Sequence, residues 1–157
     1  MRSGTVVVDA LVDGVRRQPR AEEGAWVVRL MELADGLDRE LADPTQLASV
    51  VQRLGEAADK LGARSVTGAS ASGERLAGAV AAQSAGRLRL TDGANTDQPV
   101  LIVDTILATG TQILATARRL QRAGVDRIVG AAVVADAAAL DLTRRELGDQ
   151  VLALEVI

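Results

Sequence analysis

An acid and a pair of threonines lie close together in the middle of the stretch from 99 to 124. Asp104 directly follows the apolar run Val100–Val103, and the small-residue loop Thr109–Thr111 comes shortly after it. A carboxylate can accept hydrogen bonds from sugar hydroxyls, whereas threonine hydroxyls and the backbone N–H groups beside a glycine can donate to a phosphate. This spacing predicts a site for a sugar phosphate.

The elements on either side of this loop follow from the apolar pattern. Val100–Val103 is typical of a strand buried on both faces, and we expect it to end at Asp104. A helix is predicted after the loop, because apolar residues recur at helical spacing up to Gly124: Ile113, Leu114, Ala117 and Leu120. The N-terminus of such a helix leaves backbone N–H groups unpaired, which favours an anion there.

The run V-L-I-V-D-T-I-L-A-T-G-T, residues 100–111, resembles the signature of the type I phosphoribosyltransferases. Its part D-x-x-L-A-T-G is most similar to uracil phosphoribosyltransferases, whereas A-G-V-D-R-I-V-G-A-A-V-V-A-D, residues 123–136, is more similar to the orotate enzymes. The resemblance extends from about Arg64 to the end of the chain. It implies an α/β fold with three layers, a mainly parallel sheet flanked by helices, here without the long flexible lid of active relatives.

The resemblance also implies a ligand, phosphoribosyl pyrophosphate or a nucleoside 5′-monophosphate, together with Mg²⁺. Asp104 would be the catalytic residue that holds the ribose, and also a metal ligand. The 5′-phosphate would lie on the loop after the central strand, which comprises Ala108, Thr109, Gly110, Thr111 and Gln112. Pyrophosphate would lie on the loop after the first core strand, which comprises Ser70, Ala71, Ser72 and Gly73.

Two further positions are assigned with an alternative left open. Thr105 is a substrate-binding candidate that stands where the family commonly has a second acid. Asp136, at the end of the following strand, faces a nucleobase in one interpretation and caps a helix in the other. The glycines of Gly68–Gly73 have P-loop spacing, but Glu74 and Arg75 replace its Lys and Ser/Thr, which argues against a nucleoside triphosphatase.

Several features of active relatives are absent, so two functions stay open. The loop 69–72 has no lysine or arginine, the segment Asp92–Gln98 is short where relatives have a lid, and Trp26 is the only aromatic residue. The first function is transfer of ribose 5-phosphate to a nitrogen base with release of pyrophosphate. The second is a non-catalytic subunit that senses a sugar phosphate or nucleotide or serves assembly. A flavodoxin-like phospho-acceptor role for Asp104 is disfavoured, because the usual acidic cluster is not evident.

The rest of the chain alternates between predicted helices and strands. Near the N-terminus, Thr5–Val8 can form a strand while Asp9–Val15 has helical spacing, and the choice stays open. The other predicted elements, in chain order, are a helix over about Glu22–Leu41, a helix from the cap Asp43 to Gly62, a strand over Ser65–Thr67, a helix carrying Leu76 and Val80, a half-exposed strand over Arg87–Thr91, a strand over Ile128–Val134, a helix ending at Leu147 and a strand over Val151–Val156.

Composition narrows the class of protein further. The chain has no cysteine and no histidine, which excludes disulfides, thiolate nucleophiles and a histidine base. We expect one domain over 1–157, with a helical part (1–62) and a core (63–157). The absence of a long apolar run or signal peptide predicts a cytoplasmic protein without membrane contact. A net charge of −3 disfavours nucleic acid. The resemblance and the apolar helix Trp26–Leu41 predict a homodimer.

Overall fold

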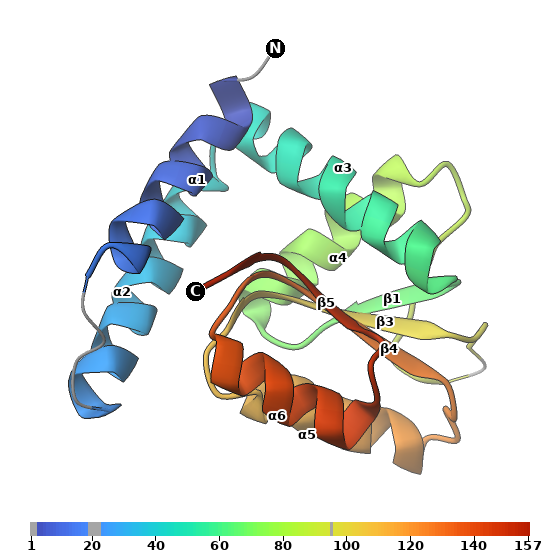
Figure 1. Ribbon diagram of the computed structural model, residues 1–157. Helices are drawn as coiled ribbons and strands as arrows, with labels where there is room; N and C mark the ends of the chain where they lie inside the picture. The colour runs from blue at the N-terminus through green and yellow to red at the C-terminus, as the bar shows by residue number, and fades with distance from the viewer. Residues whose placement is uncertain (1–2, 19–22, 95) are drawn as a thin grey trace.

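The computed structural model describes residues 3–18, 23–94 and 96–157. Five strands pair in parallel in the order β2-β1-β3-β4-β5, with helices on both faces (Figure 1). The three-layer α/β fold predicted from the sequence is therefore confirmed. The strands are β1 (Ser65–Gly68), β2 (Arg89–Leu90), β3 (Val100–Leu107), β4 (Ile128–Ala135) and β5 (Val151–Val156).

Six helices surround this sheet in the described part of the chain. They are α1 (Ser3–Arg16), α2 (Glu23–Glu40), α3 (Pro44–Leu61), α4 (Ala71–Gln83), α5 (Thr111–Arg122) and α6 (Ala137–Leu147). Helices α3 and α4 cover one face and α5 and α6 the other, while α1 and α2 lie beside the end of the sheet that holds the C-terminus (Figure 1). Across residues 3–18, 23–94 and 96–157, none of the helices combines the length and hydropathy needed to span a bilayer.

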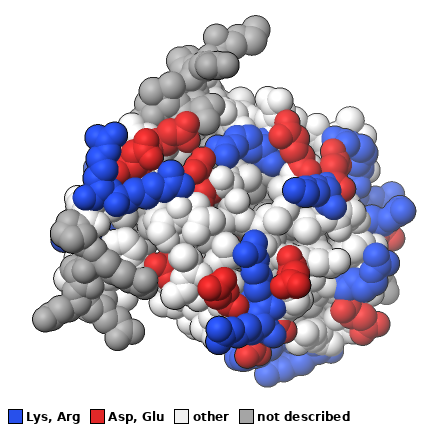
Figure 2. All heavy atoms as spheres, in the orientation of Figure 1, with Lys and Arg blue, Asp and Glu red and all other residues white. Residues whose placement is uncertain are grey.

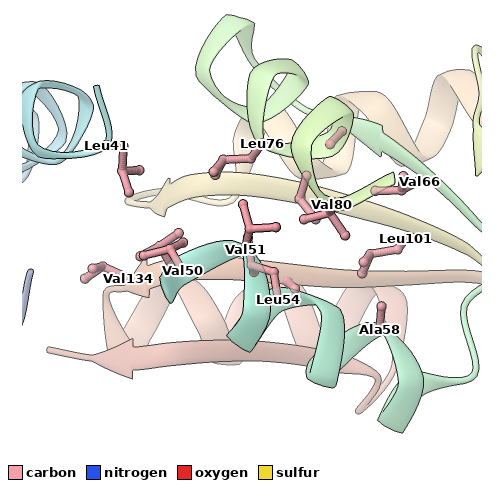
Figure 3. Close-up of a cluster of buried hydrophobic side chains, with 14 of the residues drawn as sticks. Leu41, Val50, Val51, Leu54, Ala58, Val66, Leu76, Val80, Leu101 and Val134 are labelled. Carbon is pink, nitrogen blue, oxygen red and sulfur yellow. The ribbon is translucent and has the colours of Figure 1, made fainter. Parts of the chain in front are cut away.

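The central strand β3 distributes its side chains to two cores. Leu101 and Val103 pack in the core under α3 and α4, whereas Val100 and Ile102 pack in the core over α5 and α6. All four side chains are fully buried, as expected for a strand covered on both faces. Figure 3 shows the α3 and α4 side of this arrangement, including Leu101. These two cores fix the position of β3, and with it the loop that follows.

The helix boundaries agree with the local signals in the sequence. Asp43 caps α3 by accepting hydrogen bonds from the backbone N–H groups of Thr45 (2.8 Å) and Gln46 (3.2 Å). Gly62 ends α3 in the left-handed conformation with φ +69°. The open choice at the N-terminus resolves to a helix, because Ser3–Arg16 is helical and places Val8 and Val12 in the core.

The half-exposed strand predicted over Arg87–Thr91 is wrong in extent. Only Arg89 and Leu90 pair with β1, because Ser84 holds the preceding residues in a turn. The Ser84 hydroxyl accepts a hydrogen bond from the N–H of Leu88 at 3.0 Å, and the Ser84 carbonyl accepts one from the N–H of Arg87. Leu88 is consequently buried and Leu90 is 60% exposed, so the two leucines do not share an environment.

The apolar side of α2 is largely covered within the same chain. Leu30, Leu33 and Leu37 are buried, whereas Val28 and Met31 on the same helix remain exposed. Burial of the three leucines therefore requires no second copy. The homodimer stays a prediction.

Candidate functional site

The loop after β3 leads into α5 through a glycine. Gly110 occupies the N-cap position with φ +80° and makes no side-chain cap, and the Thr109 hydroxyl accepts a long hydrogen bond of 3.4 Å from the N–H of Thr111. The hydroxyls of Thr109 and Thr111 lie 3.0 Å apart, and both residues are exposed. A cavity of about 320 Å³ is lined by the loop and its neighbours. Unpaired N–H groups, two hydroxyls and an adjoining cavity are the features of an anion site at a helix N-terminus.

Glycine is required at position 110 for two reasons. Its positive φ lies in the left-handed region, where a residue with Cβ is strained. A Cβ at this position would also lie 2.6 Å from the Oγ1 atom of Thr143. Thr143 is fully buried and donates its hydroxyl to the carbonyl of Ala139 at 2.8 Å, so it is held in place. The backbone of the loop is therefore fixed by α6 as well as by β3.

Asp104 lies inside β3 and does not end it, contrary to the prediction from the sequence. The strand continues to Leu107 because Asp104, Ile106 and Leu107 keep their pairing with β4. Asp104 can remain paired within the sheet because its carboxylate is hydrogen-bonded to other groups of the protein. The Oδ1 atom accepts hydrogen bonds from the Ser70 hydroxyl at 2.6 Å and from the backbone N–H of Thr105 at 2.8 Å.

The surroundings of Asp104 favour its protonated form. The side chain is 3% exposed, and this burial raises the pKa of Asp104 above its ordinary value, although the hydrogen bonds from Ser70 and Thr105 act in the opposite direction. The negative charge of Asp38 raises the pKa of Asp104 further. Both hydrogen bonds go to Oδ1, and Oδ2 has no hydrogen-bond partner among the described residues. Asp104 also lines the cavity at the loop after β3, so one carboxylate oxygen remains to accept a hydrogen bond.

The second candidate loop is shorter than the sequence indicated. Helix α4 already begins at Ala71, so Ala71, Ser72 and Gly73 form its first turn and not an open loop. Ser70 is the N-cap and accepts a hydrogen bond from the N–H of Gly73 at 3.0 Å. A Cβ at Gly73 would lie 2.5 Å from the carbonyl oxygen of Val103. The first turn of α4 therefore packs directly against β3.

Thr105 is buried and opens toward a different cavity from Asp104. A space of about 200 Å³ is lined by Thr105 and by residues from α2 to α4, namely Asp38, Leu41, Leu47, Ser72, Arg75 and Leu76. Neighbouring residues of a strand point to opposite faces, so Asp104 and Thr105 do not form a side-by-side pair. At its rim Asp38 accepts a hydrogen bond from the Ser72 hydroxyl at 2.9 Å.

Asp136 caps a helix and also contacts the only tryptophan. Its Oδ2 atom accepts from the N–H of Ala139 at 3.1 Å, which confirms the capping interpretation. Its Oδ1 atom accepts from the indole N–H of Trp26 at 3.0 Å. Trp26 lies outside the stretch that resembles the family, which begins at about Arg64, and nothing local links residues 110 positions apart. The fold brings Trp26 to the carboxyl end of β4, next to the strand that carries Asp104.

The described residues do not form a metal site of their own. They contain no group of three or more His, Cys, Asp or Glu side chains positioned around a common point. The buried Oδ1 of Asp104 is already engaged by Ser70 and Thr105, which leaves Oδ2 as its one available ligand atom. Mg²⁺ prefers six oxygen ligands and commonly takes only one or two of them from protein carboxylates, with waters and substrate phosphates as the others, so Asp104 would hold it only together with a bound phosphate compound.

Charges of both signs are interleaved on the molecular surface. Figure 2 shows acidic and basic side chains next to one another across the face that it presents. Arg87 and Asp59, for example, form an exposed ion pair at 2.9 Å. Such pairs contribute little stability, and they leave this face without a continuous basic area.

The fold is similar to that of solved phosphoribosyltransferases. Orotate phosphoribosyltransferase from Mycobacterium tuberculosis H37Rv matches with a TM-score of 0.66 and 19% identity, over 95% of each chain. Orotate phosphoribosyltransferase from Aeropyrum pernix gives 0.62 and 22%, over 75% of each chain. The enzyme APRTase from Giardia lamblia gives 0.62 and 19%, over 76% of this chain and 84% of that one.

These similarities are structural. No protein-family model matches the chain, and no curated protein matches it in sequence. Identities of 22% or below among these three structures establish the fold and leave the reaction open. The chain is a sequence-divergent protein with the type I phosphoribosyltransferase fold.

Proposed function

We propose that this chain binds the 5′-phosphate of a phosphoribosyl compound on the loop Ala108–Gln112. The compound is phosphoribosyl pyrophosphate or a nucleoside 5′-monophosphate. The observation that carries the proposal is the N-terminus of α5, where the N-cap Gly110 makes no side-chain hydrogen bond, beside a cavity of about 320 Å³. The Mycobacterium tuberculosis orotate phosphoribosyltransferase with the same fold is in complex with 5-phospho-alpha-D-ribosyl 1-diphosphate, which supports a ligand of this class.

The ribose would lie between this loop and Asp104. The Oδ2 atom of Asp104 has no partner among the described residues, so it is available to accept a hydrogen bond from a ribose hydroxyl. The Oδ1 atom keeps Ser70 in place. In this arrangement Asp104 contacts the sugar and also positions the loop before α4.

The indole of Trp26 would form one wall for the base of a nucleoside monophosphate. It is the only aromatic side chain in the sequence, and its N–H group bonds to Asp136 at the end of β4. An aromatic ring held by its polar atom presents a flat apolar surface, which suits a heterocycle. The Giardia lamblia APRTase of this fold is complexed with 9-deazaadenine, a ligand of that shape.

Transfer of ribose 5-phosphate to a nitrogen base is the second candidate function, because phosphoribosyltransferases share the fold. Mg²⁺ would supply charge neutralisation for a departing diphosphate, and no group of three or more acidic side chains among the described residues is placed to hold it. The chain's own contribution would be to bind the 5′-phosphate and to orient the ribose through Asp104. Steady-state pyrophosphate release with a panel of bases separates the two functions, because turnover by the purified chain contradicts a purely binding role.

Binding itself is tested by calorimetric titration of ribose 5-phosphate into the wild type and a Thr109→Ala/Thr111→Ala variant. We expect the variant to bind at least about tenfold more weakly, the loss expected for hydrogen bonds to a charged group. Thr45→Ala is the control, because Thr45 is an exposed threonine at the start of α3. Equal affinity in all three proteins would place the phosphate elsewhere. The homodimer and the cytoplasmic location stay predictions.

A further inference from the structure

The two serine hydroxyls at the start of α4 and the N–H of Gly73 are bonded to acceptors within the protein. The Ser70 hydroxyl donates to Asp104 at 2.6 Å, and the Ser72 hydroxyl donates to Asp38 at 2.9 Å. The N–H of Gly73 is capped by Ser70 at 3.0 Å. A ligand that needed these donors would have to displace a carboxylate in two places.

The nearby cation is also directed at Asp38. Arg75 lies 3.9 Å from the Oδ1 atom of Asp38 and donates a long hydrogen bond of 3.4 Å to the Ser72 hydroxyl. The charge of Asp38 is close enough to Asp104 to raise the pKa of that carboxyl. The negative charge of Asp38 therefore lies beside the first turn of α4, where it repels an anion.

The backbone leaves no room for a ligand under this turn. A Cβ at Gly68 would lie 2.1 Å from the backbone nitrogen of Glu74, and one at Gly73 would lie 2.5 Å from the carbonyl oxygen of Val103. The loop after β3 differs in two respects: its hydroxyls at Thr109 and Thr111 bond to one another and not to a carboxylate, and its helix has a glycine at the N-cap, which makes no side-chain hydrogen bond.

We infer that the site selects a ligand with a single phosphate, a sugar 5-phosphate or nucleoside 5′-monophosphate, and that Asp38 of α2 is the residue that rejects a diphosphate at the start of α4. The inference rests on the proposed function and decides between its two ligand classes. Asp38 comes from a helix outside the core that resembles the phosphoribosyltransferase signature, so the loop sequence 69–73 alone does not reveal this selection. Residues 70–73, which the sequence assigns to diphosphate binding, are in this inference the start of α4, where both serine hydroxyls bond within the protein.

The test compares ribose 5-phosphate and phosphoribosyl pyrophosphate by calorimetry on the full chain with Mg²⁺ present. The wild type should bind phosphoribosyl pyrophosphate no more tightly than ribose 5-phosphate. Asp38→Asn should raise the affinity for phosphoribosyl pyrophosphate at least about tenfold, because it removes one nearby negative charge. The affinity for ribose 5-phosphate should change less than about twofold. Asp38→Ala, which also frees the Ser72 hydroxyl, should raise the affinity for phosphoribosyl pyrophosphate at least as much.

Asp35→Asn is the matched control, because it removes the same charge from an exposed position on α2. It should leave both affinities unchanged. The inference is overturned if the wild type binds phosphoribosyl pyrophosphate tenfold more tightly than ribose 5-phosphate, or if Asp38→Asn and Asp35→Asn behave alike. Failure of ribose 5-phosphate to bind the wild type contradicts the proposed function instead. In that case inorganic pyrophosphate is the ligand that tests the inference. It must bind to Asp38→Asn more tightly than to the wild type, and equal or absent binding overturns the inference.

Discussion

The hydroxyl of Ser70 lies 2.6 Å from the Oδ1 atom of Asp104 and joins the start of α4 to the central strand. The same hydroxyl oxygen accepts the N–H of Gly73, so one side chain both caps a helix and stabilises a buried carboxyl. This relationship explains how an acid can remain inside a strand whose other side chains, apart from Thr105, are apolar. It also joins the loops after β1 and β3, which contain most of the site residues predicted from the sequence.

Ser70→Ala should destabilise the fold by about 1–3 kcal/mol. The change removes a helix cap and a donor to a buried carboxyl, each of which is worth about 1 kcal/mol or more. Ser72→Ala is the comparison, since Ser72 donates to the partly exposed Asp38 and should cost less than about 1 kcal/mol. Urea unfolding measures both, and a Ser70→Ala variant as stable as the wild type would contradict the assigned role.

The stability of the chain should depend on pH through Asp104. Burial raises the folded-state pKa of Asp104, so its stabilising contribution is full below the unfolded value near 4 and is lost as the pH rises through the raised value. Asp104→Asn lacks this titration and keeps an oxygen for Ser70. The free energy of unfolding of Asp104→Asn minus that of the wild type should therefore grow as the pH rises from about 4. A difference that stays constant or shrinks over that range would show that Asp104 does not titrate in this way.

Gly110→Ala should destabilise the chain by about 1–3 kcal/mol, because position 110 has φ +80° and its added Cβ meets the fixed hydroxyl of Thr143. Gly78→Ala makes the same chemical change inside α4, where nothing lies within 4 Å of the added Cβ. It should stabilise the chain by up to about 1 kcal/mol. Thermal unfolding of the two variants compares them directly, and effects of the same sign would refute the argument.

Trp26→Phe should lower the free energy of unfolding by about 0.5–1.5 kcal/mol, because it removes the hydrogen bond from the indole to Asp136. Asp136→Ala should cost more, because it also removes the cap of α6. Trp26 is the only tryptophan in the sequence, so its emission reports this contact. The emission should shift to the red in Asp136→Ala as the indole becomes more hydrated. An unchanged spectrum would mean that the contact does not hold Trp26.

The order of strands and helices was predictable because it depends on local signals. Apolar runs predicted β4 and β5, and Asp43 with Gly62 marked the ends of α3. These signals act over a few residues and are read directly from residue types. The parallel sheet then followed from the alternation of strands with helices.

The environment of the site was less predictable because it depends on distant partners. Asp104 was expected to end its strand, but Ser70, 34 residues away, supplies the donor that lets the strand continue. Trp26 reaches Asp136 across 110 residues, and Asp38 reaches Ser72 from another helix. The last two hydrogen bonds depend on how α2 packs across the end of the sheet, and no local sequence pattern predicts that packing.

The central claim is that the loop after β3 binds a phosphate, and an NMR titration of the full chain with ribose 5-phosphate tests it most directly. The account predicts saturable shifts, at millimolar ligand or below, of the backbone amides of Thr109, Gly110 and Thr111. Amides at the start of α4, including Ser72 and Gly73, should move much less. Amides 109–111 that stay in place, while others shift or none do, would contradict the account.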